Sequence, residues 1–345
     1  MTDVKRGPRP LMRRLSQIAA LLLCLATAVL AGLGRYAHTP LTADEGAVLE
    51  VQPGDTLSVV LTRLEQVGWL AHPWAVRLWA RFTGRGDRIV AGEYLLYPDI
   101  TAHRLLADLA AGRVQQHPVR LIEGSTFRQA LEALWASPVL SATLRGHSEH
   151  DIMASLGSPN LPAEGWFMPD TYFVTRGQTD LDVLRRSHEA MKTRLTALWQ
   201  GRGPGAPASP AQALTLASLV EKETAREAER PLVAAVLLNR LRIGMPLQID
   251  STVIYGLGDR FDGNLRRRDL TAPTPHNTYT HRGLPPTPIA LPSESALRAV
   301  MHPAAVDYLY FVARGDGSHV FSRTLAEHNR AVDCYQRKRR RRCPP

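Results

Sequence analysis

The feature that most limits how this chain can fold is an uncharged apolar run near its start. Residues 15–34 read LSQIAALLLCLATAVLAGLG and contain no charged side chain. A helix of about 20 such residues can cross a hydrocarbon core of about 30 Å. The run is preceded by five basic residues, Lys5, Arg6, Arg9, Arg13 and Arg14. Because basic flanks stay in the cytoplasm, we expect a cytoplasmic segment at 1–14, a transmembrane helix at 15–34, and everything after Arg35 outside.

A cleaved signal peptide is the alternative interpretation of this run. Ala26, Ala28 and Ala31 supply small residues near the position of a cleavage site. The run is longer than the apolar segment of a usual signal peptide, which favours a retained anchor. Both interpretations export the rest of the chain.

The net charge raises the question of an anionic partner. It is formally +10, and much of the excess lies in the N-terminal cluster and in the KRRRR run at 338–342. Elsewhere acidic and basic residues are interspersed, without an RNA-binding aromatic signature or a helix-turn-helix pattern. We therefore expect no nucleic-acid partner.

The cysteines and histidines do not form a metal-binding pattern. Of three cysteines, Cys24 lies in the apolar run, whereas Cys334 and Cys343 flank the basic tail and could pair in an oxidising compartment. The 12 histidines are scattered, without the spacing of a zinc site. We expect no metal and no other cofactor.

Residues 36–115 predict a strand-helix-helix-strand subdomain. A strand at Ala47 leads to a Pro-Gly-Asp turn, a helix capped by Asp55 or Thr56, a second helical piece and a returning strand at 92–96. The opening V-x-P-G-D-T-L-S resembles that of a LysM module, a family that binds cell-wall chains containing N-acetylglucosamine. A small packing domain that orients the rest of the chain above the membrane is the alternative.

Residues 116–200 predict a connecting α+β region, followed by a linker, GRGPGAPASP, at 201–210. Within the region, GWFMPDTYFV at 165–174 is rich in aromatic residues. Aromatic rings pack against the apolar face of a sugar, but they equally suit a corner of the core. Tyr172 is the candidate cleft residue of this segment.

The most informative stretch runs from 214 to 256. Leu216, Leu219 and Val220 share one face of a predicted helix that ends before Pro231, and Glu223 takes the next position on that face. The face changes there from apolar to charged. Partial desolvation favours the protonated carboxyl, with a pKa of roughly 6 or more, which suits an acid that cleaves glycosidic bonds.

Glu221 is the competing candidate. Two positions on a helix correspond to about 200°, so Glu221 and Glu223 point to nearly opposite sides and cannot cooperate. The neighbours of Glu221 on its face are smaller and more polar, which should raise its pKa less and favours Glu223. Both could instead be ordinary surface glutamates.

Downstream of Pro231 we expect a buried helix at 232–241 and then a β-branched, strand-like run, STVIYGLG. Gln248 and Asp250 precede this run. Asp250 is the best candidate for a second carboxylate, which would bind a sugar hydroxyl or position the acid. Its alternative role is to cap the local turn.

The last third of the chain predicts a rigid polar loop, a hairpin and a closing helix. Proline and glycine fix the loop at 276–286, in which Asn277, Thr278 and Tyr279 offer hydrogen-bonding groups to a polar polymer. A hairpin at 308–313 and 319–321 surrounds Arg-Gly-Asp-Gly. His328 lies on the helix that follows. Helices mixed with short strands predict an α+β fold, without a fixed strand order.

Four long blocks carry a family resemblance: ASLVEKET, VLLNRLRIGMPLQIDSTVIYGLG, PHNTYTHRGLPPTPIALPS and YLYFVARGDGSHVFSRTLAEHN. They resemble the endolytic murein transglycosylases, the MltG or YceG-like family, almost without a break from about 214 to 332. The resemblance implies a catalytic domain at 211–336 with Glu223, the second glutamate of its E-K-E triplet, as acid/base. It also repeats His328, and P-D-T-Y around Tyr172, which implies supporting roles for both.

The resemblance further implies a lyase that cleaves the β-1,4 bond between N-acetylmuramic acid and N-acetylglucosamine inside nascent peptidoglycan strands. One carboxylate can suffice, because the muramoyl 6-hydroxyl attacks in place of water and leaves a 1,6-anhydro end. A two-carboxylate hydrolase would need a partner about 5 to 9 Å away, and Asp250 is the obvious candidate.

Location and partners follow from the same resemblance. It implies a single-pass protein of the bacterial inner membrane with an extracytoplasmic catalytic domain, and penicillin-binding proteins as partners. A non-enzymatic, membrane-anchored peptidoglycan-binding protein is the alternative. The basic tail, 337–345, is not part of the family pattern and is expected to contact acidic lipid or wall polymers.

Overall fold

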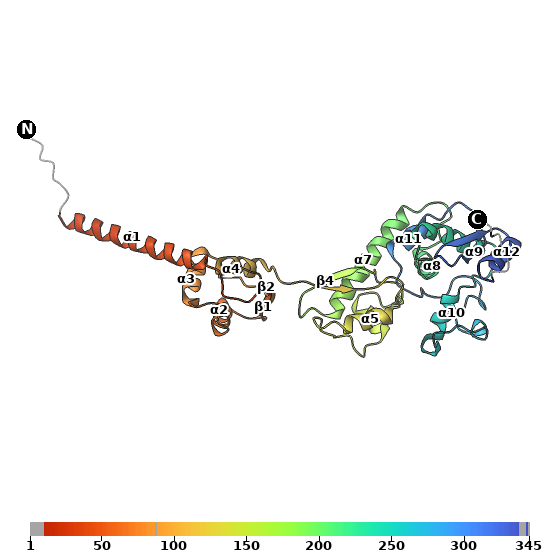
Figure 1. Cartoon of the computed structure of the whole chain (residues 1–345), viewed down its shortest axis with the longest axis horizontal. Helices are drawn as coiled ribbons and strands as arrows, with labels where there is room; N and C mark the ends of the chain where they lie inside the picture. Colours follow the sequence, from red (N-terminus) through yellow and green to blue (C-terminus); the bar gives the residue numbers. More distant parts are fainter. Residues whose placement is uncertain (1–9, 87, 338–342, 344–345) are drawn as a thin grey trace, which may run out of the picture. The chain divides into compact units, whose positions relative to one another are not determined.

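The computed structural model describes residues 10–86, 88–337 and 343 (Figure 1). Lys5, Arg6, Arg9 and the basic run 338–342 lie outside the described residues. The chain forms two compact units: unit 1 extends to His117 and includes 175–177, and unit 2 contains the remainder. Across the described residues, 12 α-helices and three two-stranded sheets form a mixed α+β structure, as predicted.

Unit 1 begins with the long helix α1 (Pro10–Ala37). Its segment from Met12 to Ala37 is long and apolar enough to cross a membrane. Side chains are exposed from Met12 to Val29, whereas Leu33 and Ala37 are buried. A helix of this kind serves as a membrane anchor or as a signal sequence.

The rest of unit 1 has the predicted strand-helix-helix-strand order. It consists of β1 (Ala47–Val51), α2 (Leu57–Gln66), α3 (Pro73–Thr83) and β2 (Gly92–Leu96), followed by α4 (Ala102–Ala111). The two strands form an antiparallel pair, and the apolar side chains on one face of this pair pack against the helices in one core. Thr56 is the cap of α2, because its side chain accepts from the Val59 amide, while Asp55 accepts from the amide of Gln52.

The first part of unit 2 contains a small sheet and three helices. Its elements are β3 (His117–Arg120), α5 (Phe127–Trp135), α6 (Glu149–Ser155), β4 (Thr171–Val174) and α7 (Asp180–Gln200). β3 and β4 form the sheet. Thr126 and Gln129 form a reciprocal capping box at the start of α5, which fixes where that helix begins.

The second part of unit 2 is a helical core with a hairpin. Its elements are α8 (Pro210–Glu223), α9 (Arg230–Arg242), α10 (Asp250–Leu257), α11 (Glu294–Met301), β5 (Tyr310–Ala313), β6 (His319–Ser322) and α12 (Leu325–Tyr335). α8 is buried from Ala213 to Val220 and packs against α7, α9 and α11. β5 and β6 form the predicted hairpin.

Two predictions of secondary structure were wrong. The central helix ends at Glu223 rather than before Pro231: Thr224 is extended, the short 3-10 helix η1 (Glu227–Glu229) follows, and Pro231 lies in the first turn of α9. The run after Asp250 is the helix α10, not a strand. Its β-branched Thr252 and Val253 are fully buried, and packing outweighs the few tenths of a kcal/mol by which such residues disfavour a helix.

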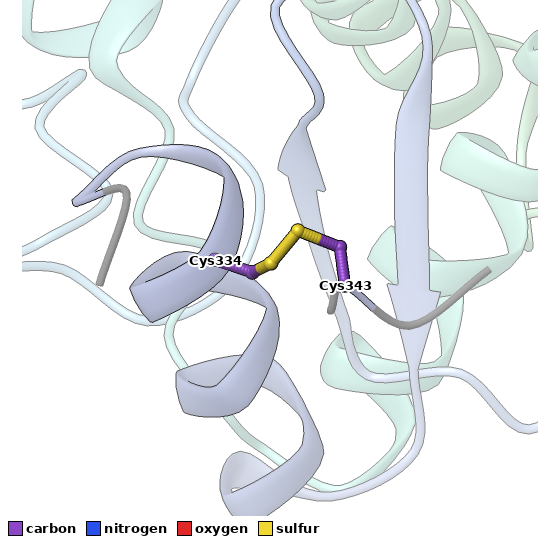
Figure 2. Close-up of a disulfide and its surroundings, with 2 residues drawn as sticks. All are labelled: Cys334 and Cys343. Atoms are coloured by element: carbon purple, nitrogen blue, oxygen red, sulfur yellow. A yellow bond between two sulfur atoms is a disulfide. The ribbon is translucent and has the colours of Figure 1, made fainter. Parts of the chain in front are cut away.

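A disulfide joins α12 to the C-terminal segment. Cys334, buried near the end of α12, is bonded to Cys343 (Figure 2). The sequence left this pairing open. Cys24, in α1, is free and exposed.

Candidate active site

Glu223 is the last residue of α8, at the point where this helix leaves the core. Every residue from Ala213 to Val220 is buried, and the amide of Thr224, the C-cap, donates to the carbonyl of Val220. Because the backbone turns away at Thr224, no further helical turn covers Glu223. The buried stripe therefore ends in a carboxyl at the edge of the core.

The surroundings of Glu223 favour its protonated form. Its pKa is raised to about 7, chiefly by burial, and the charge of Asp250 contributes to the rise. Two groups oppose this: the Ser251 hydroxyl donates to Oε1 at 3.2 Å, and the Arg240 guanidinium attracts the anion. At neutral pH the carboxyl is therefore close to half protonated, which suits a group that first donates and then accepts a proton.

Asp250 begins α10 and pairs with a tyrosine. The Tyr279 hydroxyl donates to Asp250 Oδ1 at 2.5 Å. Burial, and then the bond to Asp250, raise the pKa of Tyr279, so its hydroxyl stays protonated. Asp250 and Tyr279 thus form a hydrogen-bonded pair beside the acid. Gln248, two residues earlier, is exposed and has a left-handed backbone (φ 53°), and its amide donates to the carbonyl of Thr278.

Asn277 and Thr278 support this arrangement from inside the protein. Asn277 is fully buried; its side-chain amide donates to the carbonyls of Leu270 and Ala272, and its Oδ1 accepts from the Tyr279 amide. Thr278 is also buried, and its Oγ1 accepts from the amide of Ile249 at 3.0 Å. Their side chains thus bond backbone groups of neighbouring segments, and Asn277 also holds the backbone of Tyr279 in place.

Arg240 connects the acid to the hairpin. It is buried, donates to the carbonyls of Leu247 and Leu309, and lies over the ring of Tyr310. The imidazole of His328 also stacks on the Tyr310 ring, with 5.2 Å between the ring centroids. Burial, and then Arg240, lower the pKa of His328, which keeps its imidazole neutral. Within the described residues its Nδ1 is buried without a hydrogen-bond partner.

Glu221 lies in a different environment. Its Oε1 accepts from Arg230 Nη2 at 2.8 Å, and its Oε2 accepts from the amide of Ser293 at 2.9 Å. Both side chains of the ion pair are almost fully buried, with 6% and 5% of their area exposed. Arg230 also donates to the Ser293 hydroxyl. The Glu221 cluster, Glu221, Arg230 and Ser293, thereby joins α8 to the beginnings of α9 and α11.

The contacts of Tyr172 are with residues other than those around Glu223. Its hydroxyl donates to the carbonyl of Met168, and its ring lies under the guanidinium of Arg186. The ring packs against the core of the first part of unit 2.

A second carboxyl with a raised pKa, Glu164, was missed by sequence reasoning. Burial raises its pKa to about 7, although it accepts from the Phe127 amide and is bonded to the Tyr255 hydroxyl. Tyr255 lies on α10 four residues after Ser251, so α10 presents a partner to each carboxyl from one face. Glu164 lies in a segment without periodicity, and the sequence held no signal for it.

Arg240 and Ser251 were also missed. Arg240 follows a long apolar stretch of α9, Leu232 to Leu238, in the polar last turn of that helix, where the sequence did not distinguish it from Arg242. Ser251 had no sequence signal either, because its role depends on α10 being helical. Within the described part of the chain, no three His, Cys, Asp or Glu side chains gather as a metal site.

This site lies within a region with known relatives. The model of the YceG-like family matches residues 49–334. The chain is 38% identical over 174 residues to the endolytic murein transglycosylase of Bacillus subtilis, covering 50% of this chain and 48% of that protein. It is 25% identical over 315 residues to that of Streptococcus pneumoniae R6, covering 82% of this chain and 57% of that protein. The chain thus spans about half the length of the curated relatives it matches.

A solved structure agrees with these matches. The crystal structure of a yceG-like protein from Listeria monocytogenes has a TM-score of 0.51 and 26% identity to the chain. The match covers 83% of this chain and 99% of that one.

Proposed function

The chain belongs to the YceG-like family, and we propose that it is an endolytic peptidoglycan lytic transglycosylase with Glu223 as its acid and base. The observation that carries this proposal is the position of Glu223, a carboxyl with a pKa of about 7 at the end of a buried helix. The relatives named endolytic murein transglycosylase support the substrate class.

The proposed reaction needs no water. Glu223 gives its proton to the glycosidic oxygen as the bond from that oxygen to the anomeric carbon of N-acetylmuramic acid breaks. The 6-hydroxyl oxygen of the same sugar then bonds to the anomeric carbon, and its proton returns to Glu223. The products are a free 4-hydroxyl on N-acetylglucosamine and a 1,6-anhydro ring. Ser251 and Arg240 favour the carboxylate that exists between the two transfers.

The other site residues have supporting roles in this proposal. Asp250 is already bonded to Tyr279, which suits positioning of a sugar hydroxyl better than activation of water. Gln248 is exposed beside this pair and is available to a glycan. His328, through Tyr310 and Arg240, would hold the cationic side of the site. Tyr172 would support the neighbouring core.

We also propose where the protein works. α1 would be retained as an inner-membrane anchor at 15–34, with 36–115 as a LysM-like glycan-binding part, 116–200 as a connecting region, 201–210 as a linker and 211–336 as the catalytic domain. The disulfide between Cys334 and Cys343 supports export, because such bonds persist in oxidising compartments. Nascent strands would be its substrate, their termination its role, and penicillin-binding proteins its partners.

Product analysis tests the function. Full-length protein in detergent is incubated with purified peptidoglycan, in parallel with Glu223→Gln, and the products are identified by mass spectrometry. We expect internal cleavage with anhydro-muramoyl ends from the unmodified protein alone. Reducing ends would instead indicate hydrolysis. Glycan binding without cleavage would favour the alternative, a non-enzymatic peptidoglycan-binding protein.

A further inference from the structure

Helix α3 is fixed against α1 at the end of the apolar run. Gly34, the last residue of the run, has no side chain, and the Trp79 ring of α3 lies 3.0 Å from where a Cβ would be. Two residues further along α1, the Tyr36 hydroxyl accepts from the amide of His72, which precedes α3, at 2.9 Å. At 1.5 Å per residue, these contacts place α3 within a few ångströms of the end of the membrane-spanning segment.

The outer face of α3 carries aromatic and basic residues together. Its inner face, with Val76 and Ala80, is buried in the core of unit 1. The outer face, which we call the α3 surface, consists of Trp74, Arg77, Arg81 and Phe82, all exposed. Trp74 and Phe82 each expose 61% of their area. Within unit 1, Figure 1 shows α3 on the side from which α1 emerges, with β1 and β2 on the far side.

This composition matches the boundary between lipid and water. Tryptophan is enriched at the level of lipid headgroups, where its ring is partly apolar and its N–H stays hydrated. Arginine binds phosphate with a planar, bidentate group and is attracted to anionic lipid. No described carboxylate is paired with Arg77 or Arg81, so both are available to an external anion.

We propose that the α3 surface lies in the headgroup layer of an anionic membrane and docks unit 1 onto the bilayer that α1 crosses. The inference rests on one part of the proposed function, the retention of α1 as an anchor. Its consequence is mechanical: unit 1 is held at a fixed height by two contacts with the membrane, instead of swinging on a single helix.

Spin labels on the full-length protein test this docking. The background is Cys24→Ser, which leaves only the bonded Cys334 and Cys343. Nitroxide labels are attached at Trp74→Cys, at Leu95→Cys as an exposed control on β2, and at Leu22→Cys inside α1. The protein is placed singly in nanodiscs of phosphatidylcholine with or without phosphatidylglycerol. Power saturation compares access of oxygen, which prefers lipid, with access of a water-soluble nickel chelate.

We expect the label at position 74 to be exposed to oxygen and shielded from nickel in anionic discs, like the label at 22 and unlike that at 95. Replacing both arginines, Arg77→Gln with Arg81→Gln, should return the label at 74 to water. If that label is as accessible to nickel as the one at 95 while the label at 22 is in lipid, the docking is refuted and the anchor stands. If the label at 22 is also in water, the anchor fails and the docking with it.

Discussion

The Glu221 cluster and the Glu223 site begin two residues apart on one helix and use their carboxylates in opposite ways. The Glu221 side chain is buried and accepts hydrogen bonds from a guanidinium, an amide and a hydroxyl. Glu223 is desolvated but has one hydroxyl as a direct partner, and so tends to keep its proton. Burial alone therefore does not distinguish a structural carboxyl from a reactive one. The number of donors that reach it does.

The two carboxyls have different partners because α8 ends at Glu223. Because the helix stops at Glu223, the following turn can bring Arg230, at the start of α9, back to Glu221. The opposite side of the helix end receives α10, whose Ser251 is the donor to Glu223. We therefore expect that replacing Glu223 lowers activity, whereas replacing Glu221 lowers stability.

The largest expected effect is on activity, from Glu223→Gln. The amide keeps the size of the side chain but cannot transfer a proton, so we expect formation of anhydro-muramoyl ends to fall by about 10³-fold or more. The rate is measured from peptidoglycan digests by mass spectrometry. The thermal midpoint Tm should not fall. A variant that stays active within tenfold would remove Glu223 from its proposed role.

The second effect is on stability, from Glu221→Ala. Removing one partner of a buried ion pair leaves Arg230 unpaired, which costs about 3–5 kcal/mol of unfolding free energy. Urea unfolding of the full chain in detergent measures it. The matched control is Glu189→Ala, whose pair with Lys192 is exposed, with an expected loss below about 1 kcal/mol. If Glu221→Ala unfolds like the unmodified protein but loses all activity, the assigned roles of the two glutamates are reversed.

A third prediction concerns pH. Glu223 must carry its proton to begin the reaction, so kcat/KM should fall as the pH rises through about 7. The free energy of unfolding also depends on this proton. The ordinary pKa of a glutamate, 4.5, applies to the unfolded chain, so between pH 4.5 and about 7 the unfolded chain has lost the proton while the folded chain keeps it. Stability contributed by this group is therefore lost as the pH rises through that window.

The Glu223→Gln variant has no group that titrates at this position, so it should not lose stability between pH 4.5 and 7 in this way and serves as the control. Its Tm, relative to the unmodified protein, should rise between pH 4.5 and 7 and stay level above that. Glu164 has a similar pKa but is present in both proteins, so it cancels from the difference. A fall in activity near pH 7 that disappears in Glu164→Gln would assign the titration to Glu164 instead.

Much of the fold was predictable from the sequence wherever a local signal agreed with the packing. The strand at 92–96 and the hairpin around Arg-Gly-Asp-Gly are short patterns bounded by turn residues, and both are present. The helix after Asp250 was not predictable in this way. Its β-branched residues favour a strand locally, and the burial of Thr252 and Val253 within unit 2 favours the helix.

The site was predictable only as far as one helix determines it. The 100° period separated Glu221 from Glu223 correctly, since they contact different elements. The partners of each come from α9, α10 and α11, which no pattern in α8 reveals. Asn277 and Thr278, which we expected to offer polar groups to a glycan, are buried and bond backbone groups of neighbouring segments, because buried polar groups require partners.

The smallest predicted effects come from the two neighbours that tune Glu223 in opposite directions. Ser251→Ala removes a hydrogen bond to the carboxylate, worth about 1 kcal/mol, so the pKa of Glu223 should rise by less than about one unit. Asp250→Asn removes a nearby negative charge, so the same pKa should fall. The alkaline limb of kcat/KM should therefore move up in the first variant and down in the second. Shifts in the same direction would mean that both variants act through displacement of α10 rather than through the electrostatics of the acid.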